Sequence, residues 1–134
     1  MPDRCAMVVE DYNIIAQAWG SVLQKTEHFT GVHIYLDPYG IEEKVLELKP
    51  TLILMDINLP GSKNGIEITK DLMLSNSELK VIILSMHNEP AFVRSAFAAG
   101  AKGYVTKSSP ISELRLAINK ALNNEIYLCQ ELCA

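Results

Sequence analysis

Five short apolar segments recur along the chain, and each is followed by a longer segment with apolar residues at helical spacing. The apolar segments are 5–9, 32–36, 52–55, 81–84 and 103–105. The central ones, LILM and VIIL, are continuous rather than alternating, which is typical of strands buried on both faces of a parallel sheet. The helical stripes lie within 14–23, 41–48, 66–73, 92–97 and 111–121. This alternation predicts a strand followed by a helix, five times over.

Crossovers of this length predict right-handed connections with helices on both faces of the sheet. We therefore predict an α/β fold of the flavodoxin-like (βα)5 kind, a doubly wound parallel sheet with strand order 2-1-3-4-5. In such a sheet, ligands bind outside the carboxyl ends of the strands, at the switch point between the first and third strands. The residues that follow the strands are therefore the ones to examine for chemistry.

Three local signals support the expected helix limits. Asp37-Pro38 and Ser109-Pro110 each place a capping side chain before a proline suited to a first helical turn. We therefore predict that helices begin at these two sites. Gly100 is placed where a helix can end in a left-handed residue.

Length and composition exclude several classes of protein. The chain has 134 residues, 49% of them hydrophobic, and a formal net charge of −4, so we expect one domain with a sizeable core. No basic cluster suits nucleic acid, and no apolar run approaches the roughly 20 residues that cross a membrane. Cys5, Cys129 and Cys133 are an odd set without a further pair of zinc ligands nearby, which favours free thiols in a reducing, cytoplasmic compartment.

Polar residues with complementary chemistry follow four of the predicted strands. They are Glu10, Asp11, Asp56, Ser85 and Lys107. Three neighbouring carboxylates raise one another's pKa unless a cation joins them, and Mg²⁺ suits such oxygen ligands. Taken singly, each acid could be a cap, and the serine or the lysine a solvated loop residue. All five together at one edge favour a functional site.

Phosphoryl transfer is the chemistry that this set of residues favours. A carboxylate can act as a nucleophile and form an aspartyl-phosphate, which suits Asp56. Lys107 and a metal ion would neutralise charge on the transferred group, and Ser85 can donate a hydrogen bond to it.

The motifs at these positions resemble the response-regulator receiver family. They read VVEDYN, LILMDINLPGSKNGIE, VIILSMH and GAKGYVTKSSP, and with the βα rhythm they cover roughly residues 5–123. The stretch 85–118 further resembles the NarL/LuxR-type transcriptional regulators. The resemblance implies that Asp56 is the phospho-acceptor and that Lys107 pairs with the phosphate. It also implies that Glu10, Asp11, Asp56 and the backbone carbonyl of Asn58 bind Mg²⁺ or Mn²⁺.

The resemblance assigns switching and rate-tuning residues as well. Ser85 would be the switch hydroxyl that moves toward the phosphate, and Tyr104 the aromatic whose ring swings inward with it. From the sequence alone, Tyr104 reads more simply as a packing residue on a strand. Asn58 and His87 occupy the positions that tune the dephosphorylation rate in the family.

Three features depart from the usual family pattern. The loop 61–65 (GSKNG) is one residue longer than the usual form. Ser108 follows Lys107 where many relatives have proline, so the usual cis bond there is in question. In the NarL/LuxR group, a stretch like 125–134 (EIYLCQELCA) leads into a helix-turn-helix domain that does not follow here. We therefore expect a receiver domain at 1–123 and, at 124–134, the start of a linker to an absent effector domain; the alternative is a natural, stand-alone single-domain form.

The resemblance implies a two-component signalling domain rather than an enzyme, with only weak self-dephosphorylation. A sensor histidine kinase, or a small phosphodonor, would phosphorylate Asp56 and so control an output, with transcription the expected one. The surface formed by 92–97, 103–105 and 111–121, or the face of 14–23 with 111–121, would form a homodimer or dock the effector. DNA would be bound only through the absent domain, and no membrane is involved.

The same residues also bear on other functions. A pseudo-receiver would keep the fold and signal by protein contact without phosphorylation. A haloacid-dehalogenase-type phosphatase would need a second aspartate two residues after Asp56, where the chain has Asn58. A cobalamin site would need a histidine that DINLPG lacks, and a flavin site would need a glycine-rich loop after the first strand.

Overall fold

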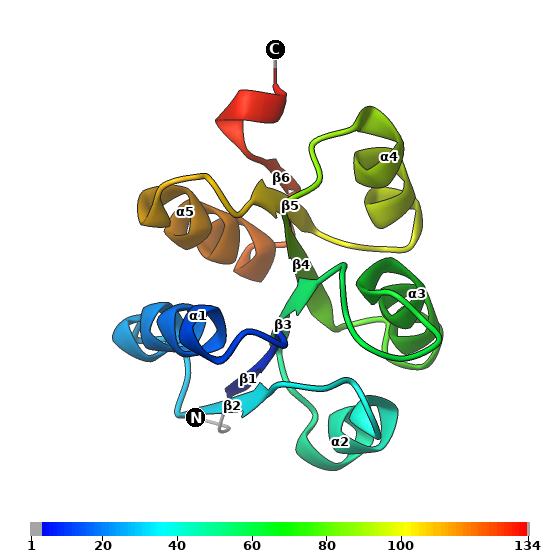
Figure 1. Ribbon diagram of the computed structural model, residues 1–134. Helices are drawn as coiled ribbons and strands as arrows, with labels where there is room; N and C mark the ends of the chain where they lie inside the picture. Colours follow the sequence, from blue (N-terminus) through cyan, green and yellow to red (C-terminus); the bar gives the residue numbers. More distant parts are fainter. Residues whose placement is uncertain (1–3, 134) are drawn as a thin grey trace.

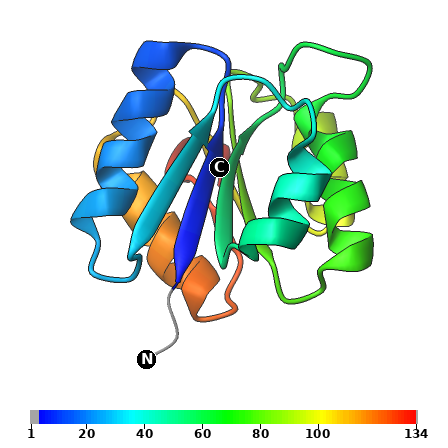
Figure 2. The same cartoon turned by 90° about the horizontal axis from the view of Figure 1, so that it is seen from below.

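A six-stranded parallel sheet forms the centre of the molecule, and helices cover both of its faces (Figure 1, Figure 2). The computed structural model describes residues 4–133. The strands are β1 (Cys5–Val9), β2 (Gly31–Tyr35), β3 (Leu52–Asp56), β4 (Lys80–Ser85), β5 (Gly103–Thr106) and β6 (Tyr127–Leu128). They are ordered β2-β1-β3-β4-β5-β6. The predicted fold class and the order 2-1-3-4-5 are confirmed, and β6 extends the sheet beyond β5.

The helices form two layers, one on each side of the sheet. Helices α1 (Asn13–Lys25) and α5 (Ile111–Leu122) lie on one side. Helices α2 (Ile41–Leu48), α3 (Gly65–Ser75) and α4 (Pro90–Ala98) lie on the other (Figure 1). Among the described residues, no helix combines the length and the apolar character that crossing a bilayer requires.

The residues of β3 show why its apolar run is continuous. Leu52 and Leu54 pack into the core on the α1 and α5 side, whereas Ile53 and Met55 pack into the core on the opposite side. Successive side chains of a strand point to opposite faces, so a strand covered on both faces needs apolar residues throughout. All five residues of β3 are buried. The final one, Asp56, is brought to the carboxyl edge of the sheet.

Helix α2 begins later than predicted. The Asp37 carboxylate accepts a hydrogen bond from the backbone N–H of Tyr39 at 2.7 Å. Because it closes this local turn, Asp37 does not cap the helix. The N-cap is instead Gly40, which has a left-handed backbone (φ +71°), and the helix starts at Ile41. The predicted helix start at Asp37-Pro38 was therefore wrong.

The predicted cap of α5 was also wrong. Ser109 Oγ lies 2.8 Å from Thr106 Oγ1, so this side chain belongs to the turn after β5. Pro110 is the N-cap of α5 and no side chain caps the helix. The end of α4 is as predicted, because Gly100 has a φ of +108°.

The segment after α5 folds back onto the sheet. Strand β6 pairs in parallel with β5, with Tyr127 opposite Gly103 and Leu128 opposite Tyr104. Cys129 follows and is fully buried in the core beside α5. A single 3-10 turn, η1 (Gln130–Leu132), comes next. A strand of two residues has too short an apolar pattern to be recognised in the sequence, so it was not predicted.

Close packing of Gly65, the first residue of α3, against the end of β3 can be tested by substitution. A Cβ at Gly65 would stand 1.8 Å from the backbone oxygen of Asp56, whereas one at Gly31 would make only ordinary contacts of 3.6 Å or more. We predict that Gly65→Ala lowers the free energy of unfolding by about 3 kcal/mol. Gly31→Ala, the matched control, should change it by less than about 1 kcal/mol. Urea unfolding measures both, and equal midpoints would contradict the packing described.

Docking of β6 predicts an alkaline transition. The Tyr127 hydroxyl donates a hydrogen bond of 2.7 Å to Glu113 Oε1. Burial and the Glu113 carboxylate raise the pKa of Tyr127 from 10.0 to about 12. Because the folded-state pKa is the higher one, the stabilisation is fully present below pH 10 and is lost as the pH rises toward 12. Because burial also raises the pKa of Tyr104, tyrosinate absorbance should show a late-titrating component to which both phenols contribute, and Tyr127→Phe should lower its amplitude by one phenol. An unchanged titration in that variant would contradict the contact.

Candidate functional site

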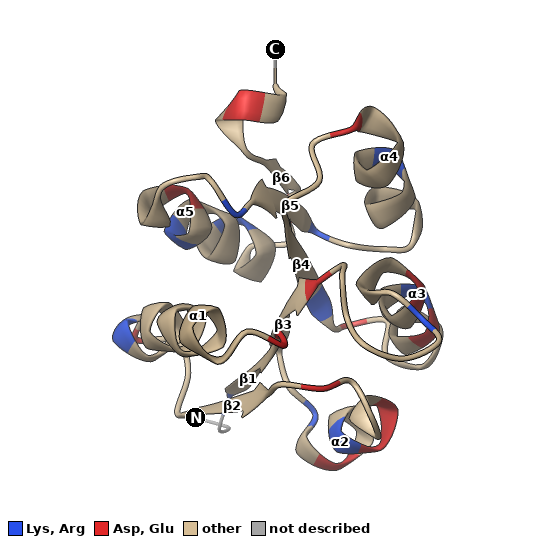
Figure 3. Cartoon of the chain, viewed as in Figure 1, with Lys and Arg blue, Asp and Glu red and all other residues tan. Residues whose placement is uncertain are grey.

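Three carboxylates meet where β1 and β3 end. These strands are neighbours, and their parallel register places Val9 opposite Met55, so the residues that follow, Glu10 and Asp56, emerge side by side. Glu10, Asp11 and Asp56 each offer an oxygen within 4.8 Å of the others. Acidic segments at this edge are visible in Figure 3, where lysine and arginine are spread over several elements. The structure thus brings together the acids that the sequence analysis selected.

One lysine balances the buried charge of this cluster. Glu10 is fully buried and Asp56 is 2% exposed, whereas Asp11 is open to solvent. Lys107 Nζ lies 2.6 Å from Glu10 Oε1 and 3.2 Å from Asp56 Oδ2. The ammonium group therefore bridges the ends of β1 and β3 from the loop after β5.

The pKa values of the pair reflect opposing effects. Burial raises the pKa of Glu10, and the hydrogen bond from Lys107 only partly offsets this. For Lys107, burial acts to lower the pKa, but the hydrogen bond to Glu10 and the charge of Asp56 outweigh it, so the pKa is raised. Lys107 is accordingly a cation at neutral pH. A single ammonium leaves the three carboxylates with an excess of negative charge, which attracts a further cation.

Asp56 keeps one oxygen without a hydrogen bond. Within residues 4–133, no group donates to its buried Oδ1. A buried acceptor without a partner costs free energy, and in a native protein it calls for a functional explanation. This oxygen, beside two further carboxylates, suits a hard divalent cation such as Mg²⁺. The donor set therefore fits the metal that the sequence analysis predicted.

Ser85 and Tyr104 both bond to the backbone of His87. Ser85 is fully buried at the end of β4, and its Oγ accepts the His87 backbone N–H at 2.9 Å. Tyr104, from β5, is fully buried too, and its hydroxyl donates to the His87 carbonyl at 2.7 Å. Burial raises the pKa of Tyr104, so the phenol stays neutral. The loop after β4 is thereby tied to β5 at a point close to the acidic cluster.

The side chains of Asn58 and His87 contact each other directly. His87 Nε2 and Asn58 Oδ1 are 3.1 Å apart, which joins the loop after β3 to the loop after β4. The imidazole stacks on Phe92 of α4, with ring centroids 4.1 Å apart and planes 15° apart. The two residues were selected through the family resemblance, and their contact was not predicted.

Lys107 also contacts an aromatic ring of α1, which the sequence does not predict. Its ammonium lies 5.5 Å from the centroid of the Trp19 ring in α1, within the range of a cation–π interaction. Trp19 lies in the apolar stripe predicted within 14–23, and no sequence signal links it to the lysine. The peptide bond between Lys107 and Ser108 is trans, as is every described peptide bond.

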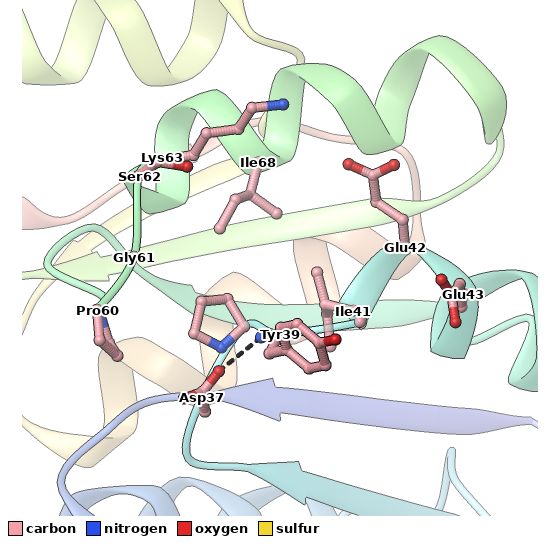
Figure 4. Close-up of a pocket in the computed structure, with 12 residues that line it drawn as sticks. Asp37, Tyr39, Ile41, Glu42, Glu43, Pro60, Gly61, Ser62, Lys63 and Ile68 are labelled. Carbon is pink, nitrogen blue, oxygen red and sulfur yellow. Dashed lines mark hydrogen bonds between the residues drawn. The ribbon is translucent and has the colours of Figure 1, made fainter.

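Two hollows lie near the carboxyl edge of the sheet. One is open, includes Asp11 and Asn58, and continues along the loop 59–64 toward Glu67. The other, of about 590 Å³, lies between the turn after β2 and the loop after β3 and is lined by Asp37, Tyr39 and Lys63 among others (Figure 4). This second hollow contains no member of the acidic cluster. It therefore plays no part in the site described here.

Comparison with known proteins gives consistent matches. The family profile described as "Response regulator receiver domain" matches residues 6–119. The oxygen regulatory protein NreC of Staphylococcus haemolyticus is 27% identical over 126 residues, which are 94% of this chain and 58% of that protein. The chain thus spans less than two thirds of the length of this relative.

Solved structures share the fold over almost the whole chain. A LuxR-family two-component response regulator from Aurantimonas sp. SI85-9A1 is 30% identical, with a TM-score of 0.89 over 98% of this chain and 93% of that one. The isolated REC domain of RcsB from Salmonella enterica serovar Typhimurium has a TM-score of 0.88 over 98% of this chain and 96% of that one. It is only 20% identical, so that likeness concerns the fold.

The fit of the acidic cluster to a divalent cation predicts stabilisation by Mg²⁺. At about 100 times its dissociation constant, a bound ion adds about 2.7 kcal/mol to the free energy of unfolding, which corresponds to a rise of several degrees in Tm. Asp11→Asn should weaken this response, since it removes an exposed ligand with little effect on folding. Asp37→Asn, which removes an exposed carboxylate outside the cluster, should keep it. Thermal melts at constant ionic strength measure the effect, and identical shifts in all three proteins would contradict the site.

Proposed function

The chain belongs to the response-regulator receiver family, and we propose that within this family it works as a phosphorylation switch whose acceptor is Asp56. The observation that supports this most directly is the buried Asp56 carboxylate, which has one oxygen bonded to Lys107 and one oxygen without a partner. The 30% identical structure is a LuxR-family two-component response regulator, and the sequence relatives include the oxygen regulatory protein NreC.

The proposed reaction is the transfer of a phosphoryl group from a nitrogen or oxygen atom of the donor to the carboxylate of Asp56. The phosphorus–nitrogen bond of a donor phosphohistidine, or the bond from phosphorus to the acyl oxygen of a small acyl phosphate, breaks while a bond from phosphorus to an Asp56 oxygen forms. The donor takes back the electron pair of the broken bond. Asp56 is held at the end of a fully buried strand, so its attacking oxygen has a defined position.

Charge stabilisation would come from groups already in place. A Mg²⁺ or Mn²⁺ ion, held by Glu10, Asp11, Asp56 and the backbone carbonyl of Asn58, would neutralise charge on the phosphoryl oxygens. Lys107 would exchange its contact with Asp56 for one with the phosphate and keep its hydrogen bond to Glu10. This requires only a small movement of a side chain that is already buried and charged.

The switch follows from the bonds around His87. A phosphoryl group brings nearly two negative charges and strong acceptor oxygens. Ser85 would turn its hydroxyl toward them and so release the backbone N–H of His87. Since Tyr104 bonds to the carbonyl of the same residue, a shift of this loop would change the packing of Tyr104. The relative populations of the conformations of the α4–β5–α5 surface would then change.

The contact between the side chains of Asn58 and His87 supports a role for both residues in setting the lifetime of the aspartyl-phosphate. These side chains bond to each other, and Asn58 lines the same open hollow as Asp11. Water that hydrolyses the aspartyl-phosphate would pass beside them. Their size and polarity would therefore tune the rate of self-dephosphorylation, the one weak hydrolytic activity that we propose.

The partners that we propose follow from the family. A cytoplasmic sensor histidine kinase would supply the phosphoryl group, and a homodimer would form through α4–β5–α5 or through α1 and α5. Relatives such as NreC are longer than this chain; we propose a receiver at 1–123 and, at 124–134, the start of a linker whose residues 127–128 pair with β5. DNA binding and control of transcription would then belong to a further domain.

Phosphorylation can be tested directly with acetyl phosphate and Mg²⁺. We expect Phos-tag electrophoresis to show a retarded band for the wild-type chain, and intact mass to rise by one phosphoryl group. Asp56→Asn should abolish both changes, because the amide cannot form the acyl phosphate. Asp37→Asn, an exposed aspartate elsewhere, should behave as wild type.

Three results would count against this function. An unshifted wild-type band, under conditions that shift a known receiver, would support a pseudo-receiver that acts by protein contact. Equal labelling of Asp56→Asn would place the acceptor elsewhere. Rapid release of inorganic phosphate from added phosphomonoesters would instead indicate a phosphatase.

A further inference from the structure

The two residues that flank Lys107 share a hydrogen-bond acceptor far along the chain. The Glu131 carboxylate, in η1, accepts hydrogen bonds from the hydroxyls of Thr106 and Ser108. The bond from Ser108 Oγ to Glu131 Oε1 is 2.9 Å long. These bonds lower the pKa of Glu131, so its carboxylate is ionised at neutral pH. An ionised acceptor forms stronger hydrogen bonds than a neutral one.

Glu131 is presented by a segment that is itself anchored. The preceding strand β6 pairs with β5, and Cys129 N–H donates to the Tyr104 carbonyl at 3.1 Å. The Gln130 N–H donates to Glu113 Oε1 of α5 at 2.8 Å. Leu132 packs against the cores on both sides of the sheet. The carboxylate therefore holds the turn after β5 from a fixed position.

The turn needs such support because of what Lys107 must reach. Its ammonium group crosses the carboxyl ends of two strands to contact Glu10 and Asp56. A lysine side chain has four rotatable bonds, so its reach depends on where its backbone is held. On the N-terminal side, the pairing of β5 with β4 holds the backbone. It continues to Lys107, whose N–H donates a hydrogen bond to the Ser85 carbonyl at 2.8 Å. After Lys107 the strand has ended, and Ser108 has an exposed side chain whose hydroxyl bonds to Glu131.

We propose that Glu131 is a positioning residue for phosphoryl transfer, because its carboxylate fixes the turn that aims Lys107 at Asp56. The proposal rests on the proposed function of Asp56 as acceptor. It gives the segment after α5 a part in the reaction. By linkage, any partner that moves this segment would alter the stability of the phosphorylated state, and phosphorylation would alter the position of the segment.

The test compares initial rates of phosphorylation by acetyl phosphate and Mg²⁺ in the 134-residue chain. We expect Glu131→Ala to lower the rate about threefold to tenfold, less than the hundredfold that a misplacement of an ångström can cost. Glu131→Gln, which keeps an acceptor oxygen, should restore part of the rate. The matched control is Glu125→Ala, which removes an exposed carboxylate of the same segment that pairs with Lys120. It should leave the rate unchanged.

A double-mutant cycle separates positioning from general stability. If Glu131 acts through Lys107, Glu131→Ala should change the residual rate of Lys107→Ala by less than about twofold. An undiminished effect in the Lys107→Ala background would overturn the proposal, as would a Glu131→Ala rate equal to wild type. In the second case the wild-type chain would still be labelled, so the function of Asp56 would stand. An unlabelled wild type would overturn both.

A second variant keeps the test valid if Glu131→Ala does not fold. Ser108→Ala removes one hydroxyl that Glu131 holds, from an exposed position, and leaves every anchor of the segment intact. It should lower the rate in the same direction with an unchanged Tm. Ser112→Ala, a serine in the first turn of α5 with an exposed side chain, is its control. A wild-type rate in Ser108→Ala together with a wild-type rate in Glu131→Gln would overturn the proposal.

Discussion

The ion pairs of Lys107 are the interaction on which the carboxyl edge of this sheet depends. A single ammonium contacts Glu10 at the end of β1 and Asp56 at the end of β3, and both carboxylates are almost completely buried. Removing one partner of a buried pair leaves an uncompensated charge, which is strongly destabilising. The ends of three strands are thus coupled through one side chain. A change in charge at any of these residues therefore changes the electrostatic energy of the others.

The same arrangement leaves some buried polar groups without their full set of hydrogen bonds. Asp56 retains a buried oxygen without a hydrogen bond, while the hydroxyls of Ser85 and Tyr104 bond to the backbone of the loop after β4. Local rules of polar satisfaction are commonly broken at functional sites, at a cost that the surrounding core offsets. Here that core is formed by two apolar clusters, one on each side of the sheet. Asp56 is attached to a strand whose residues are all buried, whereas the backbone groups that bond to the Ser85 and Tyr104 hydroxyls lie in the loop after β4.

Particular residues show how far sequence reasoning went. The continuous runs at β3 and β4 indicated a sheet covered on both faces, and the spacing of Glu10, Asp11 and Asp56 indicated that these acids would meet. The caps predicted at Asp37 and Ser109 were wrong, because short polar side chains before a proline can equally close a turn. Strand β6 was missed, since two residues carry no periodic signal.

The order of βα units, and therefore the set of side chains that gather at the carboxyl edge, follows from the residue pattern alone, because hydrophobic periodicity and strand polarity are local properties. How those side chains are paired follows from the folded arrangement. Glu10 and Lys107 are 97 positions apart, and the approach of Glu131 to the turn beside Lys107 depends on a strand that forms only against β5. Distances of a few ångströms between such residues are set by sheet pairing and helix packing. No local pattern encodes them.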